Sequence, residues 1–130
     1  MSGLKQITRE ADEREAIRRM DEYLKGYAFN RRLLRLARYE KEYFGERDAQ
    51  DGELGEPMAR ARMFAIRHFI MELPNGNEKL FLYYHYIRAE SVERCAELLG
   101  IARSSGFRLK KRALLRAAYA WEDTQKTEEA

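Results

Sequence analysis

Hydrophobic residues recur every three or four positions through most of this chain, a spacing that places side chains on one face of an α-helix. The first such region covers residues 8–44. Its stripe changes phase after Gly26, which predicts two helices, or one long bent helix, with the break near residues 26–30. Asn30 is a candidate N-cap for the second helix, because its side chain can accept a hydrogen bond from a free backbone N–H. The two stripes are Ile17, Met20, Leu24 and Tyr27, and then Phe29, Leu33, Leu36 and Tyr43.

Glycines and acidic residues interrupt the helical pattern in residues 45–57, GERDAQDGELGEP. We interpret this segment as a loop. Pro57 suits the first turn of the next helix, where its missing N–H would have no partner in any case. That helix is predicted to end near Leu73, and another is predicted for residues 77–88.

The last third of the chain predicts a short helix followed by a long one. The short helix covers residues 92–99 and ends at Gly100, since glycine readily adopts the left-handed conformation that is common at helix ends. The long helix begins near residues 103–105 and reaches about residue 121.

This pattern predicts an all-α protein without a sheet. We expect an N-terminal helical hairpin with its acidic, glycine-rich loop in residues 1–56, and a C-terminal helix-turn-helix region in residues 57–130. A single compact domain is the alternative for a chain of 130 residues. The composition agrees, because 45% hydrophobic and 36% charged residues, rich in Leu, Ala, Arg and Glu, are typical of a soluble helical protein.

The net charge of +3 says little about partners, but its distribution is uneven. Residues 103–116 contain six basic residues and no acidic one. Ala96 and Gly100 have the spacing of a helix-turn-helix, which needs a small residue facing the second helix and a glycine at the turn. Acidic side chains on that second helix would face phosphates, so their absence predicts contact with double-stranded DNA. The alternative is a basic helix that is only solvated. In the motif, the side chains expected to be buried are Leu99, Ile101 and Leu109.

The segment CAELLGIARSSGFRLKKRAL resembles the C-terminal DNA-binding region, region four, of bacterial sigma factors. The likeness is carried by Leu-Gly-Ile at 99–101, the Arg-Ser-Ser turn at 103–105 and Lys-Arg-Ala-Leu at 111–114, and covers residues 73–118. A helical N-terminal segment and a glycine-rich break before such a module are similar to small phage-encoded regulators of the ArpU/RinA type.

The resemblance implies a sequence-specific double-stranded DNA-binding transcriptional regulator encoded by a phage or prophage. We expect major-groove contacts from the start of the long helix and phosphate contacts from its later basic residues. The first set is Arg103, Ser104, Phe107 and Arg108, and the second is Lys110, Lys111, Arg112 and Arg116. Ser105 is a further candidate DNA-binding residue, with no groove or phosphate role assigned. The alternatives are a small terminase-like DNA-packaging protein and an adaptor that binds RNA polymerase.

Two positions depart from the family pattern. The family commonly has a branched aliphatic residue where Gly106 stands, so we expect an underpacked position that Gly106→Val would stabilise. Phe107 stands where many sigma factors have a DNA-contacting arginine. Its ring can pack against a thymine methyl, or it can turn inward to fill the space beside Gly106, and both alternatives stay open.

We expect no enzymatic activity, no cofactor and no metal site. His68 and His85 lie on different predicted helices without Cys or carboxylate partners at metal-binding spacing, so we interpret both as partly buried structural residues. Cys95 is interpreted as a core residue. The aromatic cluster is interpreted as core and interface, with stacking on single-stranded bases as the alternative; it consists of Phe81, Tyr83, Tyr84 and Tyr86.

The expected location is the cytoplasm. A single cysteine excludes an internal disulfide framework, and no apolar run approaches the roughly 18 residues that a membrane span needs. The expected partner is double-stranded DNA. RNA polymerase and a second copy bound through the N-terminal helices are further candidate partners, whereas a membrane is not.

Overall fold

The computed structural model describes residues 2–45 and 50–129, with side-chain environments for residues 9–45 and 55–125. These residues form helices and short connections and contain no β-strand, which confirms the all-α prediction. The elements in chain order are α1 (Ser2–Phe44), α2 (Gln50–Met71), α3 (Asn77–Leu82), the π-helix η1 (Tyr83–Ile87), α4 (Val92–Leu98) and α5 (Arg103–Glu129).

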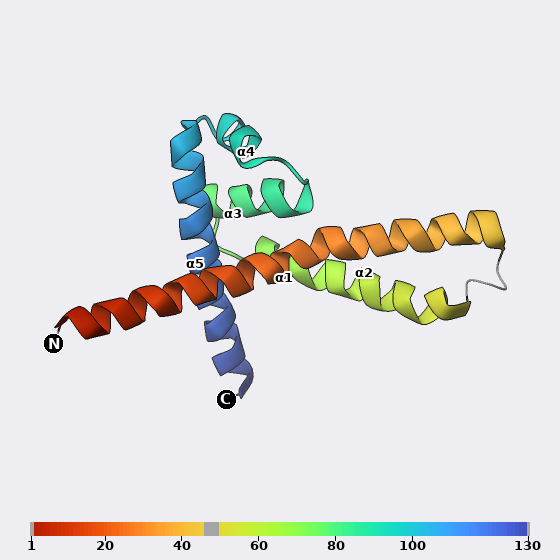
Figure 1. Cartoon of the computed structure of the whole chain (residues 1–130), viewed down its shortest axis with the longest axis horizontal. Coiled ribbons are helices and arrows are strands. Elements are labelled where there is room, and N and C mark those ends of the chain that lie inside the picture. The colour runs from red at the N-terminus through yellow and green to blue at the C-terminus, as the bar shows by residue number, and fades with distance from the viewer. Residues whose placement is uncertain (1, 46–49, 130) are drawn as a thin grey trace.

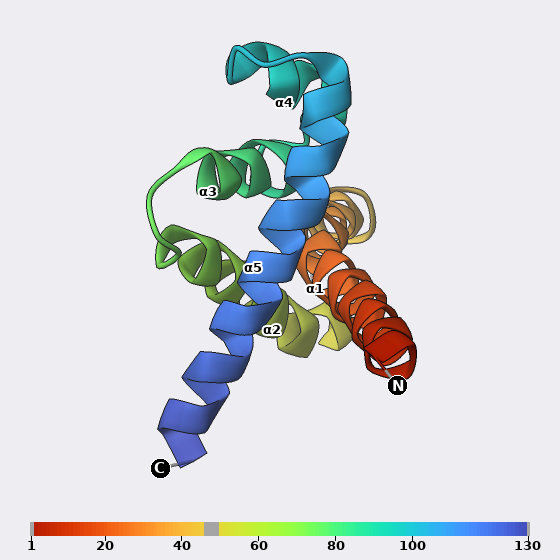
Figure 2. The same ribbon diagram turned by 90° about the vertical axis from the view of Figure 1, so that its left-hand side faces the viewer.

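The helices form a cross, with α1 as its long arm (Figure 1). The second half of α1 runs beside α2 in the opposite direction, and α5 crosses the first half of α1. In the view of Figure 2, α3, α4 and the first turns of α5 lie together at one end of the molecule. The start of α5 therefore projects away from the α1–α2 pair.

One cluster of buried hydrophobic residues joins these elements. It includes Leu24 of α1, Ile70 of α2, Phe81 of α3, Cys95 of α4 and Ala117 of α5, all with no exposed surface. Burying a large apolar side chain such as Leu24 or Phe81 stabilises the folded state by about 1.5–3 kcal/mol. Every helix thus shares the same core, and the boundary expected between residues 56 and 57 falls inside α2.

Three aromatic rings lie where α1, α2 and α5 meet. The ring centroid of Trp121 is 5.0 Å from that of Tyr23 and 5.4 Å from that of Phe69, and these two are 6.1 Å apart. Tilted and edge-on contacts of this kind are favourable for aromatic pairs. They fix the place at which α5 crosses the other two helices.

The predicted break near residues 26–30 is absent, because α1 is one continuous helix. Gly26 instead permits a close approach of α2: a Cβ at this position would lie 3.2 Å from Cδ1 of Ile66. Asn30 is not an N-cap. Its side chain is buried within α1, where Nδ2 donates to the carbonyl oxygen of Gly26 at 2.7 Å and Oδ1 has no partner among the described residues.

The loop predicted for residues 45–57 is shorter than expected. Residues 46–49 lie outside the described residues, and α2 already begins at Gln50, so Pro57 lies inside that helix. Contacts with α1 hold this part of α2 in place, since Ala59 is buried and Glu56 forms an ion pair with Lys41 at 3.0 Å. Tertiary packing outweighs the local preference of glycine and proline for a turn.

The helix predicted for residues 77–88 widens at its end. The N–H of Arg88 donates to the carbonyl oxygen of Tyr83 at 3.1 Å, the five-residue bond of a π-helix. The wider turn allows the neighbouring side chains of Tyr86 and Ile87 to be buried together. Ala89 then adopts a left-handed backbone, with φ of 58°, before α4 begins.

Candidate nucleic-acid interface

Local hydrogen bonds and backbone conformation define both ends of α4, and a short turn joins it to α5. Oγ of Ser91 accepts a hydrogen bond from the N–H of Arg94 at 3.0 Å and caps α4. Gly100 closes the helix with φ of 69°, and the N–H of Ile101 donates to Ala96 at 2.9 Å. Leu109 is buried and Ile101 packs against the core with Leu99, which confirms the burial expected in the motif.

Gly106 is the point where α5 touches α4. A Cβ on Gly106 would lie 3.0 Å from Cβ of Ala96 and 3.4 Å from the carbonyl oxygen of Val92. The prediction of an underpacked position at Gly106 is therefore wrong, because residues of α4 occupy the space beside it. The inward alternative for Phe107 is also wrong, since that side chain points outward and is 49% exposed.

Four side chains share the solvent-facing side of the first half of α5: Ser104, Phe107, Arg108 and Lys111. Their spacing of three and four residues places them on one face of the helix. We call these four residues the outer face of α5. It lies opposite the buried Gly106 and Leu109.

The other predicted site residues lie elsewhere around α5. Ser105 and Lys110 are half-buried, and Lys110 interacts electrostatically with Asp21 and His85. Arg103 forms an ion pair with Glu93 at 3.1 Å. The structure therefore does not bring all nine predicted residues together on one surface.

Arg112 and Arg116 both bind one acidic residue of α3. Their Nε atoms lie 3.0 Å and 3.3 Å from the carboxylate of Glu78. Residues 103–116 contain no acidic residue, but acidic residues of α3 and α4 lie beside them in the fold. The surface around these basic residues is therefore not free of acidic groups. Among the described residues, Arg108 and Lys111 are left without an acidic partner on the outer face of α5.

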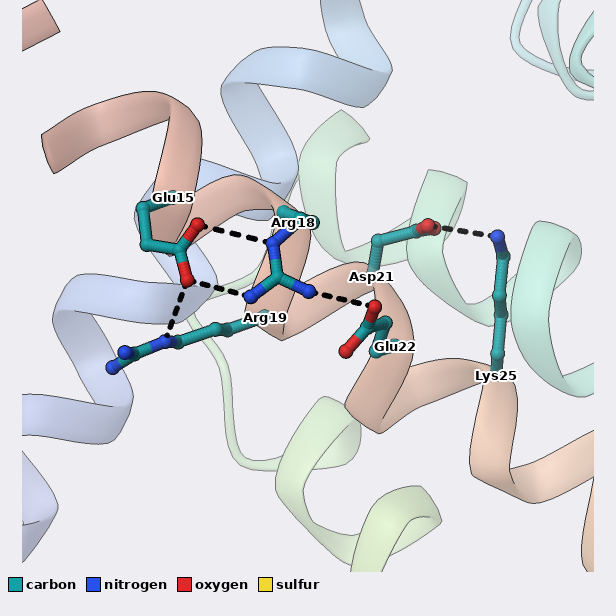
Figure 3. Close-up of polar contacts among 6 residues, drawn as sticks. All are labelled: Glu15, Arg18, Arg19, Asp21, Glu22 and Lys25. Carbon is teal, nitrogen blue, oxygen red and sulfur yellow. Dashed lines mark hydrogen bonds and ion pairs between the residues drawn. The ribbon is translucent and has the colours of Figure 1, made fainter. Parts of the chain in front are cut away.

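Arg18, Arg19 and Lys25 of α1 are paired with acidic residues of the same helix, as Figure 3 shows. Arg18 binds Glu15 at 2.6 Å and Glu22 at 2.7 Å, and Arg19 also binds Glu15, at 3.1 Å. The hydrogen bond from Arg18 is the main reason that the pKa of Glu15 falls to about 2. These three residues therefore offer little unpaired positive charge, in contrast to the outer face of α5.

A second polar contact joins α1 to η1. The hydroxyl of Tyr86 donates to Oδ1 of Asp21 at 2.5 Å, while Lys25 lies 2.9 Å from Oδ2. Burial raises the pKa of Asp21, but the hydrogen bonds from Tyr86 and Lys25 outweigh it, so this pKa lies below its ordinary value. Burial and the same hydrogen bond raise the pKa of Tyr86.

The burial and contacts of His85, His68 and Cys95 can be compared with the interpretations made from the sequence. His85 is half-buried, as expected, and its Nδ1 donates to the carbonyl oxygen of Glu90 at 2.7 Å. The expectation for His68 is wrong, because this residue is exposed and stacks on Phe64. Cys95 is a core residue, as predicted, and burial raises the pKa of its thiol to about 11.

The described residues contain no group of three or more His, Cys, Asp or Glu side chains placed to hold a metal ion. In the same part of the chain, none of the helices has both the length and the apolar character that crossing a membrane requires. Comparison of the chain with protein-family models, with curated proteins and with solved structures finds no match.

Proposed function

We propose that this protein is a sequence-specific double-stranded DNA-binding transcriptional regulator, encoded by a phage or prophage, rather than an enzyme. In this proposal α4 and α5 act as a helix-turn-helix, and the outer face of α5 enters the major groove. The observation that carries the proposal is the outer face itself. It combines a projecting helix end with two cations that have no acidic partner among the described residues.

Each side chain of the outer face has a chemical counterpart on DNA. Arg108 can donate two hydrogen bonds to the O6 and N7 atoms of guanine, and Phe107 can pack against a thymine methyl. Ser104 can exchange hydrogen bonds with a base or a phosphate. Lys111 suits a phosphate, because its ammonium group acts as a point charge on a flexible stem.

The paired arginines remain compatible with phosphate binding. The ion pair between Arg103 and Glu93 is exposed on both sides, and such pairs contribute only about 0–1 kcal/mol. Glu78 balances one of the two charges of Arg112 and Arg116, so this pair keeps a net positive charge. We propose that Arg103, Arg112 and Arg116 bind DNA phosphates beside the outer face of α5.

The resemblance of residues 73–118 to sigma region four supports the same proposal. Ala96 and Gly100 stand at the positions that the motif needs, and the contact between Ala96 and the backbone at Gly106 sets the distance between the two helices. By the order of its segments the chain also resembles small phage-encoded regulators of the ArpU/RinA type.

The test is a comparison of three alanine variants on two kinds of DNA. A site is first selected from a random DNA library, and its affinity is then measured by fluorescence anisotropy beside that of random DNA. We expect Arg108→Ala to weaken binding to the selected site by about 1–3 kcal/mol and binding to random DNA less. We expect Lys111→Ala to weaken both about equally and to lower the salt dependence by roughly one charge.

The matched control is Arg62→Ala on α2, because Arg62 is exposed and has no acidic partner among the described residues. Its affinity for both DNAs should stay at the wild-type value. A library that yields no enriched site would contradict sequence-specific binding. Equal losses for all three variants would show that the outer face has no special role. A large ring in solution would favour the terminase-like alternative, and binding to RNA polymerase without DNA would favour the adaptor.

A further inference from the structure

The second hydrophobic stripe of α1 is exposed. The exposed fractions are 53% for Phe29, 41% for Leu33, 58% for Leu36 and 67% for Tyr43. These residues follow one another at steps of four, three and seven, so they form a single line along the helix. The line faces away from the buried Leu24. Leu33 and Leu36 adjoin α2, where they line a pocket with Gly55 and Ala59, but α2 leaves both side chains exposed.

An exposed apolar line of this length needs a physical explanation. Large apolar patches on a protein surface usually mark an interaction site. The stripe and the neighbouring Tyr39, which stacks on Tyr43 and is 53% exposed, together offer on the order of 500 Å² per chain. A symmetric pair would bury about 1,000 Å² in total, the lower limit for a specific interface.

We propose that this stripe binds the same stripe of a second copy of the chain, with the two α1 helices antiparallel and Leu36 on the twofold axis. In that register Phe29 lies opposite Tyr43, and Leu33 lies opposite Tyr39. Every large apolar side chain of the stripe then faces another one. The inference does not depend on DNA binding, since it rests on α1 alone.

Two charged residues beside the stripe favour the antiparallel register. Arg32 of one copy lies opposite Glu40 of the other, and twofold symmetry forms this pair twice. Neither residue has an ionic partner among the described residues, and neither has a charged residue of opposite sign three or four positions away on α1. A parallel arrangement in register would place Arg32 against Arg32 and Glu40 against Glu40, which is unfavourable.

Sedimentation equilibrium of the full chain tests the proposal through a charge swap. We expect a dimer whose dissociation constant rises about tenfold in Arg32→Glu and in Glu40→Arg, because each change creates two like-charge contacts. The double variant Arg32→Glu with Glu40→Arg should return to within about threefold of the wild type, since the pair is restored with its signs exchanged.

Arg67→Glu is the matched control for charge reversal, because Arg67 is exposed near the Met71 end of α2, whereas the α2 residues that adjoin Leu33 and Leu36 are Gly55 and Ala59 near its other end. It should leave the dissociation constant unchanged. Leu36→Asp should abolish the dimer, while circular dichroism should show an unchanged helical fold. A wild-type chain that is monomeric at about 100 µM, or a dimer that Leu36→Asp does not weaken, would overturn the proposal. Failure of the double variant to recover would overturn the antiparallel register.

Discussion

At the scale of single residues, Gly106 shows how one missing side chain sets the distance between two helices. The backbone of α5 comes so close to α4 that a Cβ on Gly106 would lie 3.0 Å from Cβ of Ala96. Ala96 is itself almost fully buried, at 1% exposure. The contact therefore has no free volume into which a larger residue can expand.

We predict that Gly106→Val lowers the free energy of unfolding by about 1–3 kcal/mol, the usual cost of inserting atoms into a packed contact. The gain in helix propensity, about 1 kcal/mol at most, only partly offsets this loss. Urea denaturation followed by circular dichroism measures the difference.

Gly55→Ala provides the matched control for this prediction. Gly55 lies inside α2, and a Cβ there would meet nothing within 4 Å. Only the higher helix propensity of alanine then affects stability, so this variant should be more stable than the wild type by up to about 1 kcal/mol. A Gly106→Val protein more stable than the wild type would show that α4 can move away at little cost.

At the scale of helical elements, the contact between Tyr86 and Asp21 ties η1 to α1. Tyr86 is 5% exposed, and its hydroxyl reaches a carboxylate 65 positions earlier in the sequence. Hydrogen bonds to a charged group contribute more than those between neutral groups. This contact therefore helps to hold the α3–η1 segment on the long helix.

We predict that Tyr86→Phe lowers the free energy of unfolding at pH 7 by about 1–3 kcal/mol, because it leaves the Asp21 carboxylate without its buried donor. The effect should depend on pH. The folded-state pKa of Asp21 lies below its ordinary value of 3.8, so its contribution is fully present above that value and is lost as the pH falls through the lowered pKa. The difference between wild type and variant should shrink below about pH 4.

Tyr119→Phe is the control for loss of a tyrosine hydroxyl, because Tyr119 is 48% exposed. Its stability should equal that of the wild type across the same pH range. Urea titrations at several pH values between 3 and 8 give both curves. A Tyr86→Phe effect that is independent of pH would contradict the role assigned to the Asp21 carboxylate.

At the scale of the whole molecule, the shared core predicts cooperative unfolding. Trp121 is the single tryptophan of the chain, and it contacts Tyr23 of α1 and Phe69 of α2. Its fluorescence therefore reports the junction of three helices, while far-ultraviolet circular dichroism reports all of them. The two signals should change together in a single transition.

We predict that Leu24→Ala lowers the free energy of unfolding by about 2–5 kcal/mol in both signals, because Leu24 has no exposed surface and its truncation leaves a cavity. Leu98→Ala is the control, since Leu98 is 42% exposed, and its effect should stay well below that of Leu24→Ala. Two separate transitions, with only one of them shifted, would indicate two independent domains.

Much of the local structure of this protein follows from its sequence alone. The helical periodicity and the left-handed Gly100 place α4 and the start of α5 within a residue or two of the expected bounds. Cys95 and Leu109 are buried as their positions predict. These features are predictable because they depend on backbone conformation and on hydrogen bonds within one or two turns of a helix.

The tertiary structure decided which groups come together across the chain. Only packing shows that Gly26 and Gly106 are sites of close helix contact and that Phe29 is exposed. In the same way, Arg112 is paired with Glu78, 34 positions away in the sequence. Burial and ion pairing depend on distances in space, which a pattern of neighbouring residues does not contain. The charge of a segment can therefore be counted from the sequence, whereas the unpaired charge on a surface is set by the helices packed around it.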